Sequence, residues 1–252
     1  MSWRTVLLFP DTHVPDHNMK AVRSLLEHIS HHPPAEIIHL GDLMDTKAPA
    51  RWSRATADEW AGTLQSEVDA SVRLLEQLRA VFDGPLSFHM GNHERRIQTY
   101  LRKYGPAMAS LHALHLPNLL QFERLQVTQL PDYHKVAPGW VTTHGDHGSL
   151  NANAGSTALG LAKKIGYSVA CGHTHRMGLI PFTSGIGHNR RTVWGLEAGN
   201  LMDLGKASYL PSFGAANWQT GFAYLHISNT RVTAELVSIN VDGSFSYQGR
   251  VS

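Results

Sequence analysis

The sequence predicts an α/β fold, because short apolar segments alternate with longer amphipathic ones and five of the short segments end in polar residues of similar kind. These segments are TVLLFPDTH (5–13), AEIIHLGD (35–42), PLSFHMGNH (85–93), WVTTHGD (140–146) and YSVACGHTH (167–175). Each begins with an apolar, partly β-branched run, which is typical of a buried strand, and then ends in Asp, Asn or His. Strands that alternate with helices predict βαβ units and a largely parallel or mixed sheet.

The connecting segments show the apolar spacing of helices. Apolar residues recur at steps of three and four residues, which places them on one face of a helix. For the first of these segments, Asn18 or Asp16 is a plausible N-cap. The segments with this period are 18–30, 57–82, 97–104 and 158–165.

The last third of the chain has a different character. LIPFTSG, RRTVWGLEAGN, GFAYLHIS and RVTAELVSIN are strand-like, are punctuated by glycines and show no long helical period. No linker-like stretch separates them from the preceding part. We therefore expect one domain over residues 1–252, with a motif-bearing α/β part (1–176) and an additional β-sheet region (177–252) that closes it.

Composition narrows the class of protein. A hydrophobic content of 42% and a charged content of 17% are those of a globular chain, and a net charge of +2 is weak support for any partner. The single cysteine, Cys171, excludes an intrachain disulfide and a cysteine-based zinc site, and we expect it to lie in the core. No run approaches the ~20 apolar residues of a membrane span. We expect a cytoplasmic protein without a membrane partner; its oligomeric state is not predicted.

The polar residues at the ends of the five predicted strands are expected to form one site. In open α/β sheets, ligands gather at the carboxyl ends of the strands. A turn or a helix cap explains any one of these residues, but not the same placement five times. The set is Asp11, His13, Asp42, Asn92, His93, His144, His173 and His175.

The donor atoms of this set indicate a metal centre. Imidazole and carboxylate without thiolate favour manganese first, with iron, zinc and nickel as alternatives, over calcium or magnesium. Seven ligands, the set without His93, are too many for one tetrahedral ion and suit two ions, with one bridging carboxylate. Two divalent ions outweigh the charges of Asp11 and Asp42, so the site stays cationic and attracts phosphate. Such pairs generate hydroxide and support in-line attack at phosphorus.

Five motifs of the chain resemble those of the calcineurin-like metallophosphoesterase superfamily. The motifs DTH, GDLMD, GNHE, THGD and GHTH match the family pattern D-x-H, G-D-x-x-D, G-N-H-[DE], a later H and G-H-x-H, in this order over residues 11–175. The resemblance implies a four-layer α/β/β/α sandwich of two mixed β-sheets flanked by helices. It also implies phosphoester hydrolysis by a hydroxide that bridges two metal ions.

The resemblance assigns a role to each residue of the site. His93 would be the general acid that protonates the leaving alkoxide, or would position it. The first metal would be held by Asp11, His13, Asp42 and His175. The second metal would be held by Asp42, Asn92, His144 and His173.

Further residues near the motifs are candidates for supporting roles. Asp45 is either a partner of the ligands or a helix cap, and Glu94 is a candidate for orienting His93. His39 and His89 are expected to be hydrogen-bonded core histidines. Asn200 is a candidate to reach the site from a later strand, and Trp52 either stacks a base or packs. Arginines that could hold phosphate oxygens, or lie at the surface, are Arg95, Arg176, Arg96, Arg51 and Arg54.

The residues after the second motif bear on the substrate. Thr46 and Lys47 stand where the protein phosphatase branch has an arginine and a glycine, so a phosphoprotein phosphatase is an alternative and not the first choice. GDLMD is more similar to the phosphodiesterase and recombination-nuclease branches. We expect hydrolysis of phosphodiester bonds in nucleotides or nucleic acid, with monoesters also possible as substrates. A DNA nuclease subunit that needs a partner is a second alternative. An inactive scaffold would have lost ligands, and none is missing.

Overall fold

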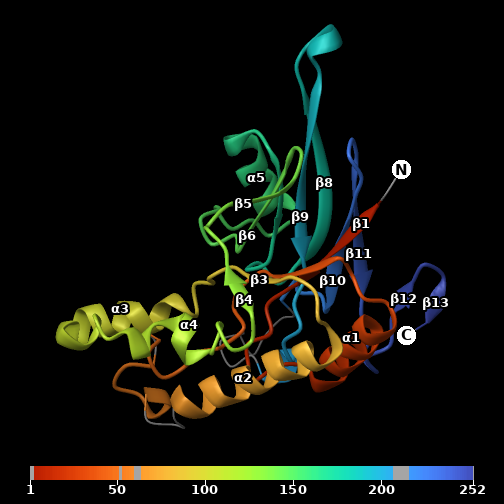
Figure 1. The fold of residues 1–252 in the computed structure, drawn as a ribbon. Coiled ribbons are helices and arrows are strands. Elements are labelled where there is room, and N and C mark those ends of the chain that lie inside the picture. Colours follow the sequence, from red (N-terminus) through yellow and green to blue (C-terminus); the bar gives the residue numbers. More distant parts are fainter. Residues whose placement is uncertain (1–2, 51–52, 60–63, 207–215, 252) are drawn as a thin grey trace.

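Two β-sheets lie face to face in the computed structural model, and helices cover the outer side of each sheet (Figure 1). The structure describes residues 3–50, 53–59, 64–206 and 216–251. The predicted four-layer α/β/β/α sandwich is therefore confirmed.

The first sheet has six strands in the order β11-β10-β1-β2-β3-β4. Strands β1 to β4 run parallel to one another, whereas β10 pairs antiparallel with β1 and β11 antiparallel with β10. The sheet is therefore mixed, as expected. Its strands are β1 (Arg4–Phe9), β2 (Glu36–His39), β3 (Leu86–Phe88), β4 (Val127–Gln129), β10 (Gly221–Ile227) and β11 (Val232–Ser238).

The second sheet has five strands in the order β5-β6-β7-β9-β8. Its middle strands β6, β7 and β9 are parallel, and the edge strands β5 and β8 pair antiparallel with their neighbours. The β8-β9 hairpin extends far beyond the rest of the sheet (Figure 1). The strands are β5 (His134–Ala137), β6 (Trp140–Thr143), β7 (Ser168–Cys171), β8 (Met177–Ser184) and β9 (Arg191–Ala198); β12 (Ser246–Tyr247) and β13 (Arg250–Val251) form a separate pair.

The first helix begins after a residue whose side chain caps it. Asn18, not Asp16, caps the first helix, since its Oδ1 accepts from the backbone N–H groups of Lys20 and Ala21, both at 3.1 Å. No helix in the described part of the chain is long and apolar enough to cross a membrane. The α-helices are α1 (Met19–His31), α2 (Leu64–Val81), α3 (Arg95–Tyr104), α4 (Leu116–Leu119) and α5 (Ser156–Ile165). The 3-10 turns are η1 (Ala57–Glu59), η2 (Pro106–Met108), η3 (His112–Leu114), η4 (Gly187–Asn189) and η5 (Leu204–Lys206).

Alternating side chains divide the interior into three apolar layers. In β1, Leu7 and Phe9 pack in the core that includes α1 and α2, whereas Val6 and Leu8 pack in the core between the two sheets. Cys171 is buried in a third core, between the second sheet and α5, as the sequence predicts. Both sheets thus pack apolar side chains on both faces.

Two expectations about the elements are wrong. Most strands of residues 177–252 do not form an additional sheet: β8 and β9 belong to the second sheet, β10 and β11 extend the first, and β12 and β13 pair with each other. Apolar alternation identifies a strand but not its partner, so this assignment was not readable from the sequence. The predicted helix 57–82 begins later than expected, because Ala57–Glu59 form a 3-10 turn, 60–63 lie outside the described residues, and α2 starts at Leu64. Strands β4 and β5 were not predicted because their sequences, VTQ and HKVA, contain no apolar run.

A buried histidine in α1 makes the stability of the fold depend on pH. His28 is 2% exposed and its Nε2 lies 3.0 Å from the hydroxyl of Tyr224. Burial, followed by the charges of His32 and His31, lowers the pKa of His28 from 6.5 to about 4. Since the unfolded chain binds the proton more tightly, stability is present above pH 6.5 and is lost as the pH falls towards 4. This histidine alone is expected to reduce the free energy of unfolding by about 2 kcal/mol between pH 7 and pH 5.

Urea unfolding of the wild type and of His28→Gln at both pH values measures this contribution. Glutamine keeps a donor for Tyr224 but does not titrate. Between pH 7 and pH 5 the free energy of unfolding of His28→Gln should therefore fall by about 2 kcal/mol less than that of the wild type. The matched control is His188→Gln, on the exposed tip of the β8-β9 hairpin, which should follow the wild type. Equal pH dependence in all three proteins would contradict the assignment.

Candidate metal centre

The five predicted strand ends meet at one edge of the sandwich. Three of them follow β1, β2 and β3 of the first sheet, and two follow β6 and β7 of the second. Because the two sheets face each other, loops that are far apart in the sequence approach across this edge. The structure brings together all eight residues of the predicted set: Asp11, His13, Asp42, Asn92, His93, His144, His173 and His175.

One half of the site is formed by Asp11, His13, His175 and Asp42. His13 Nε2 and His175 Nε2 lie 3.0 Å apart, so that both rings point to a common position. The distance from His175 Nε2 to Asp11 Oδ2 is 3.6 Å, and that from His13 Nε2 to Asp42 Oδ2 is 3.9 Å. Four donor atoms therefore converge from three different loops.

The other half of the site is formed by Asn92, His144, His173 and again Asp42. His144 Nε2 lies 3.0 Å from Asn92 Oδ1 and 3.4 Å from Asp42 Oδ2. Ligand atoms of Asp42, His144 and His173 all lie within 4.8 Å of one another, an arrangement that could hold a metal ion. Oδ2 of Asp42 thus lies within 4 Å of the nearest histidine nitrogen in each half.

Four residues of the set adopt left-handed backbone conformations. The φ angles are 52° for His13 and Asp42, 64° for His173 and 59° for His175. Such angles are uncommon for residues other than glycine, and they persist at functional sites when the surrounding structure enforces them. These backbone conformations therefore place the four side chains in the site.

Two glycines of the motifs allow the loops to approach each other closely. A Cβ on Gly91 would lie 2.0 Å from Asp42 Oδ1, and one on Gly172 would lie 2.6 Å from Asp11 Oδ1. Neither contact is sterically possible without moving a carboxylate of the site. The glycines of GNH and of GHTH are therefore required by packing.

Asp11 shows that the donor set fits a cation. Its side chain is fully buried, and neither of its carboxylate oxygens has a hydrogen-bond partner among the described residues. Burial raises the pKa of Asp11 well above its usual value, and the carboxylate of Asp42 adds to this effect. A buried carboxylate without partners is costly, and coordination of a divalent cation supplies the missing partner.

The histidines of the site differ in the direction in which their pKa values are shifted. Burial lowers the pKa values of His13 and His175, and that of His173 to about 4, which leaves neutral rings suited to binding metal. For His144, burial acts in the same direction, but the carboxylates of Asp42 and Asp11 raise the pKa to about 10. The centre of the site is thus negative enough to attract positive charge.

His93 is held in one orientation by the loop that contains Asp45. Its Nδ1 donates to the carbonyl oxygen of Asp45 at 2.7 Å, and its backbone N–H donates to Asp42 Oδ1 at 3.0 Å. Nε2 faces the site, 3.8 Å from Asp42 Oδ2. Burial lowers the pKa of His93, but the carboxylates of Asp42 and Asp45 outweigh it, so the pKa is raised overall.

Asp45 and Glu94 support the loops in different ways. The carboxylate of Asp45 lies 3.1 Å from His13 Nδ1 and 3.2 Å from His93 Nδ1, so it contacts both rings and is not a helix cap. Burial opposes its ionisation, but these two contacts hold its pKa below the usual value. The buried carboxylate of Glu94 accepts from the backbone N–H groups of Asp42, Met44 and Gly91 at 2.9–3.0 Å. These hydrogen bonds hold the loops around Asp42 and do not include the His93 ring, so a role of Glu94 in orienting His93 stays a prediction.

The predicted arginines occupy different positions. Arg95 forms ion pairs with Asp132 at 2.9 Å and with Asp146 at 2.5 Å, which hold its guanidinium away from a substrate role. Arg176 has a buried Nε without a hydrogen-bond partner among the described residues. The candidates Arg51 and Trp52 lie outside the described residues.

Three further residues contact the site: Arg96 and Asn200, which the sequence had singled out, and Trp218, which it had not. Arg96 lies with a guanidinium nitrogen 2.7 Å from the Nε2 of His93, which is three residues earlier in the turn that leads into α3. Trp218 packs edge-on against His175, with ring centroids 4.3 Å apart, and no local pattern indicates this. Asn200 was expected near the site; its amide donates to the carbonyl oxygen of His175 at 3.1 Å.

The core histidines agree with their prediction. His39 Nδ1 accepts from the backbone N–H of Gly41 at 3.1 Å, and its Nε2 lies 3.2 Å from the hydroxyl of Thr12. His89 Nε2 lies 2.9 Å from the hydroxyl of Thr142. Both rings are buried and hydrogen-bonded behind the candidate ligands.

Comparisons with known proteins bear on the family and the fold of the chain. A family model described as calcineurin-like phosphoesterase matches residues 4–177. The gene 54 proteins of Mycobacterium phages L5 and D29 are each 40% identical to the chain, with 98% of both chains covered. The crystal structure of Vps29 from Chaetomium thermophilum shares the fold, with a TM-score of 0.53 at 12% identity over 99% of this chain and 96% of that one. The chain belongs to the calcineurin-like phosphoesterase family.

Proposed function

We propose that the protein hydrolyses phosphodiester bonds of nucleotides or nucleic acid at a centre of two divalent metal ions. The position of Asp42 Oδ2 carries this proposal, since it lies 3.9 Å from His13 Nε2 and 3.4 Å from His144 Nε2. A carboxylate oxygen between two groups of imidazoles is suited to bridge two ions. Family membership supports a metal-dependent phosphoesterase, and the diester substrate is our proposal.

The two halves of the site provide one ligand set each. Manganese is the first choice of metal, with iron, zinc and nickel as alternatives, because the donors are imidazole nitrogen and carboxylate or amide oxygen without thiolate. When bound, two such ions lower the pKa of a water molecule and polarise the phosphoryl oxygens. The first set is Asp11, His13, Asp42 and His175, and the second is Asp42, Asn92, His144 and His173.

His93 is the group that would deliver a proton to the leaving oxygen. Its Nδ1 donates to the carbonyl oxygen of Asp45, which can only accept, so Nε2, which faces the site, is the nitrogen that would exchange the proton. A guanidinium can only donate, so Nε2 accepts from Arg96 in this contact. Protonation of Nε2 therefore requires Arg96 to turn away, and the phosphate of a substrate offers its guanidinium a new partner.

Metal removal and restoration test the proposed function. Chelated protein is expected to lose hydrolysis of bis-p-nitrophenyl phosphate and to regain it with Mn²⁺, with p-nitrophenyl phosphate cleaved more slowly. Addition of Ca²⁺ is the control, because this imidazole-rich donor set does not favour it. Faster cleavage of the monoester would favour a phosphatase. No hydrolysis of either ester by protein that binds Mn²⁺ would contradict the proposal.

A further inference from the structure

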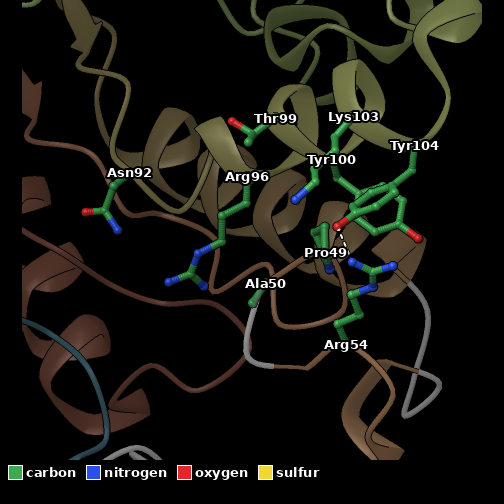
Figure 2. A pocket seen from close by; sticks show the side chains of 9 residues that line it. All are labelled: Pro49, Ala50, Arg54, Asn92, Arg96, Thr99, Tyr100, Lys103 and Tyr104. Carbon is green, nitrogen blue, oxygen red and sulfur yellow. Dashed lines mark hydrogen bonds between the residues drawn. The ribbon is translucent and has the colours of Figure 1, made fainter.

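A cavity of about 430 Å³ opens beside the candidate metal centre, along helix α3. Figure 2 shows that its lining runs from Asn92 and Arg96 to Tyr100 and Tyr104. Asn92 belongs to the metal centre, and Arg96 contacts His93, so the cavity is continuous with the place where a phosphate would react. Its volume falls within the ~300–1,000 Å³ of pockets that bind small ligands. It therefore has room for a part of the substrate beyond the reacting group.

The lining of the cavity is cationic. Arg54, Arg96 and Lys103 contribute positive charges, and none of the described residues that line it is acidic. Arg96 and Lys103 are both in α3, whereas Arg54 approaches from the loop across the cavity (Figure 2). Guanidinium and ammonium groups arranged in this way are suited to phosphate oxygens. The cavity favours an anionic ligand group in addition to the phosphate that reacts.

Two tyrosines provide an aromatic surface in the same cavity. Tyr100 and Tyr104 are four residues apart in α3, on one face of the helix, and their ring centroids are 4.8 Å apart. Both are partly exposed, at 36% and 43%. Arg54 donates to the Tyr104 hydroxyl at 2.8 Å, and its guanidinium carbon lies 4.7 Å from the ring centroid. Tyr104 is thus held in place, and Tyr100 is the ring offered to a ligand.

We propose that this cavity binds one nucleotide unit of the substrate, next to the phosphodiester that is cleaved. The base stacks on Tyr100, and the further phosphate of that unit lies between Lys103 and Arg96. This inference rests on the proposed function, and it adds which part of the chain recognises the substrate. The same chemistry is present in a short nucleotide and at the end of a nucleic acid strand.

Binding without turnover tests the cavity directly. Thymidine 3′,5′-bisphosphate is titrated calorimetrically into chelated protein, with inorganic phosphate in parallel. The wild type is expected to bind the bisphosphate at least ~10-fold more tightly than phosphate. Tyr100→Leu should weaken that binding about 5- to 100-fold, the range expected for one stacked base. The proposal would be overturned if the wild type bound phosphate as tightly as the bisphosphate, or if Tyr100→Leu bound the bisphosphate as tightly as the wild type.

A charge variant with a neighbouring control tests the phosphate contact. Lys103→Ser is expected to weaken binding of the bisphosphate and to flatten its salt dependence. Arg102→Ser removes the same charge one position earlier in α3, and Arg102 does not line the cavity. The control should therefore bind like the wild type. If both variants lose the same affinity, the loss comes from the overall charge of the protein, and the proposed contact between Lys103 and the phosphate is wrong.

Hydrolysis separates failure of the cavity from failure of the proposed function. Methyl p-nitrophenyl phosphate has neither base nor second phosphate, so Tyr100→Leu should raise its KM less than that of a dithymidine substrate, and the control Arg102→Ser should leave its cleavage unchanged. Dithymidine phosphate and its 3′-phosphorylated form should show an increase in KM of about 5- to 100-fold in the Tyr100→Leu variant. Cleavage of all three diesters with no effect of the variant would overturn the cavity and leave the function standing. Tight binding of the bisphosphate without cleavage of any diester would support the cavity and contradict the proposed function.

An oligothymidylate of ten nucleotides distinguishes a short nucleotide from the end of a nucleic acid strand as the natural ligand of the cavity. Cleavage faster than that of the phosphorylated dithymidine compound assigns the cavity to a strand end. Slower cleavage assigns it to a short nucleotide. Both outcomes support recognition of a nucleotide unit, provided that Tyr100→Leu raises KM for the preferred substrate.

Discussion

Replacing Asp42 with asparagine is expected to abolish phosphodiester hydrolysis and to reduce the number of metal ions bound per chain. Asp42 Oδ2 lies near histidine nitrogens of both halves of the site, at 3.9 and 3.4 Å. Asparagine keeps the shape of the side chain, including an acceptor for the backbone N–H of His93, but removes the negative charge. The loss should exceed the ~10–100-fold that follows removal of an outer hydrogen-bond partner of a metal ligand.

Metal analysis and kinetics on the same preparations measure this effect. The matched control is Asp132→Asn, because Asp132 is an exposed aspartate that pairs with Arg95 outside the ligand set. It should retain metal content and activity. An Asp42→Asn variant that binds two ions and still hydrolyses diesters would show that the carboxylate does not bridge.

Replacing His93 with asparagine is expected to lower kcat by about 10²- to 10⁴-fold while metal content stays that of the wild type. His93 is not in either ligand set, and its role is to supply a proton to the leaving oxygen. The loss should therefore be large for dithymidine phosphate, whose alkoxide is a poor leaving group. It should be small for bis-p-nitrophenyl phosphate, because p-nitrophenolate needs no proton to leave.

A comparison of the two substrates distinguishes proton donation from a structural effect. An equal loss for both leaving groups, or a loss of metal, would place His93 among the structural residues. His188→Asn, on the exposed tip of the β8-β9 hairpin, is the control and should behave as the wild type.

The convergence of the candidate ligands could be predicted because each one directly follows a recognisable buried strand. Asp11, Asp42 and Asn92 follow strands of one parallel set, and parallel strands present their carboxyl ends at one edge. Nothing in the sequence shows how the two sheets face each other. The placement of His144 and His173 opposite Asp42 therefore depended on the family resemblance.

The supporting contacts were less predictable, since they depend on tertiary geometry. Asp45 contacts two histidines from different loops, and Glu94 points to backbone amides, not to the adjacent His93. Arg95 and Arg96 are neighbours in the sequence, yet one forms surface ion pairs and the other contacts His93. Helical position explains this difference, but only once the start of α3 at Arg95 is known.

Anomalous diffraction from crystals of the manganese-loaded protein tests the two-metal centre most directly. We expect two manganese peaks ~3.5–4 Å apart, with a carboxylate oxygen of Asp42 between them. One peak should lie near Asp11, His13 and His175, and the other near Asn92, His144 and His173. A single peak, or two peaks that do not share Asp42, would contradict the account.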